Sequence, residues 1–286
     1  MSYEIVFPTL EGFEPTRQTL HLYSRIIAAV PRAHGEFHPK WRHISLRVQP
    51  DGLITDKVGL PDGGELRLKM DLVGHKILLL VDGQEAVEFS MLEGKSSTAL
   101  ADDVLGAVAS MGLIGEIDRD KFEDDEPREY DPAQADKFLT PLVNADRIFK
   151  AHRGTLSGEV GPVQLWPHGF DLAFEWFGTR IQVFEEQGDK QETPAQLNLG
   201  FYPGSPGVAP YFYSNPWPFE ADALLGKDLP DGAAWHTEGW QGTILPYEVL
   251  AGRPDAEELL IGYAKRVFEI SSPTLVAGWE TGSSAV

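Results

Sequence analysis

The chain of 286 residues carries 24 Lys and Arg against 44 Asp and Glu, a formal net charge of −20, and it contains no cysteine. The lack of cysteine excludes disulfides, thiolate nucleophiles and Cys-based metal sites, and 42% apolar residues exclude a disordered chain. The acidic balance disfavours nucleic acid and anionic membranes as partners, because phosphate binding requires a basic surface.

The first eight residues show neither a basic region nor a long apolar core, so we expect no secretory signal peptide. The longest nearly unbroken apolar run, residues 77–81, is far shorter than the ~20 residues that cross a bilayer. We therefore expect a soluble, cytoplasmic protein.

Residues 1–115 are predicted to form a first half that consists of a helix, antiparallel strands and a second helix. The first helix is expected to start near Pro15 and to end at Pro31, because a proline ring disrupts a helix interior. Ser97 is predicted to cap the second helix, and Gly112 to end it. Strands separated by Gly-, Pro- and Asp-containing turns are predicted at residues 43–48, 53–58, 65–73, 76–81 and 86–89.

Residues 116–130 form an acidic segment. Nine carboxylates lie between Glu116 and Asp131, against three basic residues. Such a run could chelate a divalent cation, but charge runs are usually solvated. We interpret this segment as a connector between two halves.

Residues 131–272 are predicted to form the second half, followed by a tail at 273–286 that we expect to fray. Asp131 followed by Pro132 marks the start of a helix. Asp255, with Glu258 three residues later, predicts a capping box on the last helix. Strands are predicted at residues 163–166, 170–177, 181–184, 196–202, 211–213 and 242–249.

The two halves share short sequence features at a constant offset. His34 and His152, each near the end of a predicted helix and close to a glycine, are 118 residues apart, and the first strands and turns repeat at a similar spacing. We therefore predict an α+β fold of two related helix–antiparallel sheet–helix halves, with an internal duplication and pseudo-twofold packing.

Motifs that identify a reaction are missing from the sequence. It contains no glycine-rich dinucleotide fingerprint, no P-loop, no serine elbow and no His-Glu-x-x-His. His34, His38 and His43 lie close together, but Pro31 and Pro39 prevent a single helix from aligning them as ligands. We expect no cofactor and no bound metal.

Paired carboxylates and clustered aromatics offer two weaker signals. Asp171 and Glu175 share one face of a predicted strand, separated by roughly 13 Å, too far for the ~5–9.5 Å pair of a glycosidase. Sixteen of the thirty Phe, Trp and Tyr residues lie between Trp166 and Tyr247. These aromatics could build the core or line an apolar ligand cleft.

An ordered set of short motifs runs through nearly the whole chain. They are Thr19-Leu20-His21-Leu22, Trp41-Arg42-His43, Gly52-Leu53, Asp71-Leu72 with His75, Tyr130-Asp131, Phe170-Asp171-Leu172-Ala173, Arg180, Gly200-Phe201-Tyr202-Pro203-Gly204 and Leu245-Pro246-Tyr247-Glu248. This set resembles a bacterial family known as domain of unknown function 5996. The resemblance implies no established activity.

The resemblance also shows where this chain diverges from the family. Members carry a histidine where this chain has Gln164, and a His-Glu pair where it has Pro194 and Ala195. Four polar residues occupy matching positions, namely His21, His43, His75 and Asp171. We therefore interpret the chain as a divergent member.

Our leading hypothesis is a protein that binds a small molecule in an aromatic-lined cleft between or within the two halves. In it, His43 exchanges or shares a proton near neutral pH, Arg180 holds an anionic group, and Glu248 is a carboxylate partner. The candidate ligand-binding residues are His43, Asp171, Arg180, Tyr202, Trp217, Tyr247 and Glu248.

Two other classes of protein fit the same residues. One is a hydrolase or metal-dependent enzyme that uses His21, His43, His75 and an aspartate. The other is a non-catalytic scaffold in which these histidines are satisfied core groups. The sequence determines neither the ligand nor the oligomeric state.

Overall fold

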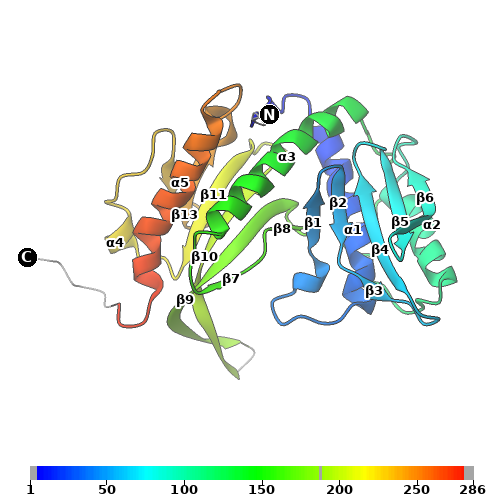
Figure 1. Cartoon of the computed structure of the whole chain (residues 1–286), viewed down its shortest axis with the longest axis horizontal. Helices are drawn as coiled ribbons and strands as arrows, with labels where there is room; N and C mark the ends of the chain where they lie inside the picture. The colour runs from blue at the N-terminus through cyan, green and yellow to red at the C-terminus, as the bar shows by residue number, and fades with distance from the viewer. Residues whose placement is uncertain (1–4, 187–188, 280–286) are drawn as a thin grey trace, which may run out of the picture.

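One antiparallel sheet extends through the computed structural model, which describes residues 5–186 and 189–279 (Figure 1). The first half contributes β1 (Leu46–Gln49), β2 (Gly52–Thr55), β3 (Val58–Gly59), β4 (Glu65–Asp71), β5 (Lys76–Val81) and β6 (Gln84–Ser90). The second half contributes β7 (Glu159–Val160), β8 (Gln164–Trp166), β9 (Asp171–Glu186), β10 (Asp189–Tyr202), β11 (Tyr211–Trp217), β12 (Ala234–His236) and β13 (Gly242–Pro246). The strand order is β12-β13-β11-β10-β9-β8-β1-β2-β4-β5-β6, with β3 paired to β4 and β7 paired to β9.

Helices cover one face of this sheet. They are α1 (Glu14–His34), α2 (Ser97–Ser110), α3 (Pro132–Arg153), the short α4 (Ala221–Leu224) and α5 (Ala256–Ser271), with 3₁₀ turns η1 (Arg42–Ile44), η2 (Tyr247–Val249) and η3 (Ser272–Leu275). Helix α1 packs on β2, β3 and β4, α3 packs on β1 and β9, and α5 packs on β10 and β11. These helices bury the apolar side chains that alternate along the strands.

The pairing of β1 with β8 joins the two halves. Leu46 lies opposite Leu165, and Leu165 lies opposite Leu172 on β9. All three side chains are buried in one hydrophobic cluster that extends through both halves. The predicted α+β class is confirmed.

Each half begins with a long helix, continues as antiparallel strands and ends with a helix. The two halves differ in their number of strands. The internal duplication and its pseudo-twofold packing therefore stay a prediction.

The prediction that the first helix ends at Pro31 is wrong. Helix α1 continues to His34, because Pro31 stands in the last turn and costs the helix only one backbone donor. The Pro31 carbonyl still accepts a hydrogen bond from the Gly35 N–H at 2.9 Å. The predicted start of a strand at residue 43 is also wrong. Trp41 adopts a left-handed conformation (φ 54°) and starts η1, which the Ser45 hydroxyl closes by donating to the Arg42 carbonyl at 2.7 Å.

Two of the three predicted helix caps need correction. Asp131 caps α3 as predicted and accepts from the Ala133 N–H at 2.9 Å. Helix α2 is capped by Ser96 rather than Ser97. Asp255 stands at the start of α5, but its carboxylate bonds to Arg253 and caps nothing.

The acidic connector and the predicted tail are both partly docked on the body of the protein. Phe122 is buried, and the Glu129 carbonyl accepts a hydrogen bond from the α1 hydroxyl of Thr19 at 2.6 Å. Thr274 and Leu275 in η3 are also buried, so the tail does not fray at its start. Residues 280–286 of that tail lie outside the described residues. None of the helices in the described segments is long and apolar enough to cross a membrane.

A buried histidine at the end of α3 makes the stability depend on pH. Burial, together with the charge of Lys265, lowers the pKa of His152 to about 4, whereas an unfolded histidine titrates near 6.5. Between pH 4 and pH 6.5 the unfolded chain therefore binds more protons at this histidine than the folded chain does. The resulting contribution of His152 to the free energy of unfolding is complete above pH 6.5 and is lost as the pH falls towards 4.

We predict that His152→Leu reduces the loss of stability between pH 7.5 and pH 5.0 by about 1–2 kcal/mol, because the titrating group is removed. Urea unfolding at both pH values measures the difference. His168→Gln, which replaces an exposed histidine, is measured in parallel as a control. An unchanged pH dependence in His152→Leu would contradict the assignment.

Candidate functional site

The face of the sheet opposite the helices carries polar and aromatic side chains. The alternation that buries Leu172 and Phe174 directs Asp171, Ala173 and Glu175 to this second face. We call the following residues of β8–β11 the open-face patch: Gln164, Asp171, Ala173, Glu175, Asn198, Gly200, Tyr202, Tyr211, Tyr213 and Asn215.

A tyrosine–aspartate pair lies at the centre of the open-face patch. Tyr213 is paired with Gly200 across β10 and β11, and a Cβ on Gly200 would lie 2.3 Å from the Tyr213 Cζ atom. The missing side chain therefore lets the Tyr213 ring cross β10 and donate its hydroxyl hydrogen to Asp171 Oδ2.

Burial controls the ionisation of this pair. It raises the pKa of Asp171, against the hydrogen bond from Tyr213, which lowers it. Burial also raises the pKa of Tyr213 well above its usual value, and the charge of Asp171 adds to the effect. The phenol consequently stays protonated near neutral pH and serves as a donor to the carboxylate.

A pocket of about 240 Å³ opens above this pair. It is lined by Gly169, Asp171, Tyr202, Tyr211, Tyr213, Asn215 and Trp240. The ring centroids of Tyr202 and Tyr211 are 5.2 Å apart, and the Tyr211 ring stacks on Trp240 at 6.4 Å. Asp171 is the one charged side chain among these lining residues.

Next to the pocket, the open-face patch holds buried polar groups with incomplete hydrogen bonding. Gln164 Oε1 accepts from Ser45 Oγ at 2.8 Å and from Arg47 Nη1 at 2.6 Å. In the part of the chain that the structure describes, Gln164 Nε2 and Asn198 Oδ1 have no partner. Burial raises the pKa of Glu175. These groups can offer hydrogen bonds to a water or ligand, since buried polar atoms are rarely unpaired.

Asp171 and Tyr202 are the two predicted site residues that line this pocket. His43 lines a separate pocket of about 580 Å³ with Arg42 and Arg47. Its ring stacks on Trp41 at 5.7 Å, and burial lowers its pKa.

The structure does not bring the other four predicted residues into either of these pockets. Arg180 lies farther along β9 and pairs with Glu220 at 2.5 Å. Trp217 packs against Phe184. Tyr247 is in the core and donates to the Pro8 carbonyl at 2.7 Å, whereas Glu248 beside it is exposed. Arg180 is in β9, Trp217 is at the end of β11, and Tyr247 and Glu248 are in η2. Their order along the sequence does not bring them together.

The three histidines of the alternative metal centre do not converge. His21 Nε2 lies 3.0 Å from the Pro167 carbonyl oxygen, and His75 Nδ1 lies 2.9 Å from the Tyr130 hydroxyl. Over residues 5–186 and 189–279, no three His, Asp or Glu side chains come together in an arrangement that could hold a metal ion. This alternative therefore lacks a ligand set in the described part of the chain.

Sequence reasoning did not select Tyr211, Tyr213, Asn215 or Trp240 as site residues. The segment Tyr211–Asn215 alternates, and Phe212 and Ser214 are buried on the opposite side. Once Phe212 is assigned to the core, alternation places Tyr211, Tyr213 and Asn215 on the open face. Trp240 reaches the pocket from the loop before β13, for which the sequence provides no periodic signal.

The contact between Gly200 and Tyr213 can be tested with one methyl group. We predict that Gly200→Ala costs about 1–3 kcal/mol, because the Cβ would collide with the Tyr213 ring and force it away from Asp171. Thermal and urea unfolding measure the loss. Gly59→Ala on β3 is the matched control, since nothing lies within 4 Å of its Cβ. If both variants unfold like the wild type, the ring does not lie against Gly200 as described.

The order of motifs along the chain is matched by a comparison with known families. A profile described as Family of unknown function (DUF5996) matches residues 7–285. No curated protein and no solved structure gives a significant match. Since the match covers nearly the whole chain, the protein belongs to the Family of unknown function (DUF5996).

Proposed function

We propose that the protein binds a small organic cation, an amine or a quaternary ammonium, in the pocket of the open-face patch. The supporting observation is the lining of this pocket: Tyr202, Tyr211 and Trp240 line it together with Asp171, its single carboxylate, and no basic side chain is among the lining residues. Aromatic faces attract cations through their quadrupole, and a carboxylate adds a full negative charge.

The hydrogen bond from Tyr213 supports this assignment. It orients Asp171 while leaving the carboxylate charge uncompensated by any cation within the pocket lining. Burial raises the pKa of Asp171 because a charged carboxylate is costly there. A bound cation removes that cost, so binding and ionisation of Asp171 reinforce each other.

The volume of the pocket and the net charge of the protein favour the same class of ligand. A pocket of about 240 Å³ is smaller than the roughly 300–1,000 Å³ of typical ligand sites, so it suits a compact ammonium group rather than a large substrate. A net charge of −20 attracts cations to the surface over a distance set by salt screening.

Choline and its neutral carbon analogue, 3,3-dimethylbutan-1-ol, provide a direct test, because they share size and shape but differ in charge. We predict that choline binds at least about tenfold more tightly than the alcohol, because the cation–π and carboxylate contacts require the positive charge. Calorimetric titration measures both affinities. Asp171→Asn should remove most of this difference, and Tyr211→Ala should weaken choline binding.

Asp222→Asn is the control for Asp171→Asn, because it removes an equal charge from an exposed position on α4. It should leave choline binding unchanged. Equal affinity for choline and the alcohol, no binding of either at millimolar concentration, or an Asp171→Asn variant with wild-type affinity would contradict the proposal.

A further inference from the structure

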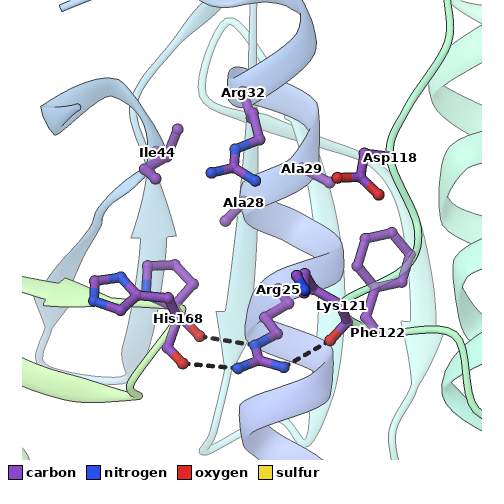
Figure 2. A pocket seen from close by; sticks show the side chains of 10 residues that line it. Arg25, Ala28, Ala29, Arg32, Ile44, Asp118, Lys121, Phe122 and His168 are labelled. Carbon is purple, nitrogen blue, oxygen red and sulfur yellow. Dashed lines mark hydrogen bonds between the residues drawn. The ribbon is translucent and has the colours of Figure 1, made fainter. Parts of the chain in front are cut away.

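A second pocket, of about 400 Å³, lies beside α1, between the acidic connector and the turn that joins β8 to β9. Figure 2 shows Arg25 and Arg32 on one face of α1, with Ala28 and Ala29 between them. Lys121 of the connector faces this surface from the other side. None of these residues lines the pocket of the open-face patch.

Arg25 connects the two walls of this α1 pocket. Its Nη1 donates to the Lys121 carbonyl at 2.7 Å, its Nη2 to the His168 carbonyl at 2.7 Å, and its Nε to the Pro167 carbonyl at 3.2 Å. The dashed lines in Figure 2 mark these bonds. The acceptors are neutral carbonyl groups, so the charge of Arg25 is oriented but not cancelled.

A neighbouring histidine strengthens the same wall. His21 Nε2 lies 3.0 Å from the Pro167 carbonyl. Burial, followed by the charges of Arg25 and Arg17, lowers the pKa of His21 to about 4. His21 is thus neutral at pH 7, and its Nε2–H donates to this carbonyl in the wall of the α1 pocket.

The remaining charges around the pocket are also mainly positive. Across the described residues, neither Arg32 nor Lys121 takes part in an ion pair, and Asp118 is the one carboxylate that lines the pocket. Arg32 instead lies over the Trp41 ring at 5.8 Å. Three cations against one carboxylate form a local positive region on a chain whose net charge is −20.

The floor between these cations is apolar. Ala28 and Ala29 are buried in the wall of α1, and Phe122 is 2% exposed. An apolar floor with a cationic rim is complementary to a molecule that has an apolar body and an anionic end.

We propose that the α1 pocket binds a small amphipathic anion, an apolar chain or ring that ends in a carboxylate, with the carboxylate near Arg32 and Lys121. Arg25 holds the connector and the turn in place and adds its charge. This site differs from the pocket of the open-face patch in position and in the charge of its ligand, so the two proposals are independent.

Octanoate, octan-1-ol and octylamine test this proposal, because they share one chain length and differ in charge. Titration calorimetry at low salt should show saturable binding of one octanoate per chain. Octan-1-ol should bind at least about fivefold more weakly and octylamine not at all, and added NaCl should weaken octanoate binding. Equal binding of octanoate and octan-1-ol would overturn the proposal, as would no octanoate binding at millimolar concentration.

The double variant Arg32→Gln/Lys121→Gln keeps most of each side chain and removes both rim charges. We expect it to weaken octanoate binding by about fivefold. Lys57→Gln/Arg67→Gln is the matched control, since it removes the same charges from the separate pocket around His43 and should bind like the wild type. Both residues of the test variant are exposed, and melting curves confirm that it folds.

A second readout locates the ligand independently of charge. Ala28→Phe fills the floor of the α1 pocket and should abolish octanoate binding, and melting curves confirm that the variant folds. Wild-type octanoate affinity in Ala28→Phe, or in the Gln double variant, would place the ligand elsewhere and overturn the proposal.

Discussion

The pairings of β1 with β8 and of β8 with β9 put the apolar side chains of both halves on one face of a single sheet. Leu46 opposite Leu165 transmits one register from the first half to the second. Because the side chains of a strand alternate with a period of two residues, a slip of β9 by one position against β8 would move Asp171 into the core and Leu172 out of it. The same register therefore builds the hydrophobic core and the open-face patch.

The open-face patch contains groups that are costly to bury. Asp171 and Glu175 have pKa values raised by burial, and Gln164 Nε2 and Asn198 Oδ1 have no hydrogen-bond partner in the described structure. Unpaired buried polar atoms each oppose folding by about 1–3 kcal/mol. The extended apolar cluster under α1, α3 and α5 offsets this cost. Such concentrations of unfavourable polar groups typically mark functional sites.

Local charge differs between the two pockets, although both belong to one acidic chain. The pocket of the open-face patch has a single carboxylate among aromatic rings. The α1 pocket has Arg25, Arg32 and Lys121 around an apolar floor. Net charge thus describes long-range attraction, whereas the charge that each pocket presents depends on which side chains the fold brings together.

The sequence by itself determined the α+β class, the family, the cap at Asp131 and the alternation of β9, because these depend on local periodicity and on ordered motifs. It also selected Asp171 and Tyr202. It did not place Arg180 beside Glu220 or Tyr247 in the core, and it did not predict Lys121 facing α1. These contacts join segments from 40 to 239 residues apart, and local spacing carries no information at such separations. Only the tertiary structure decided them, because the strand order and the packing of helices fix which distant side chains share a pocket.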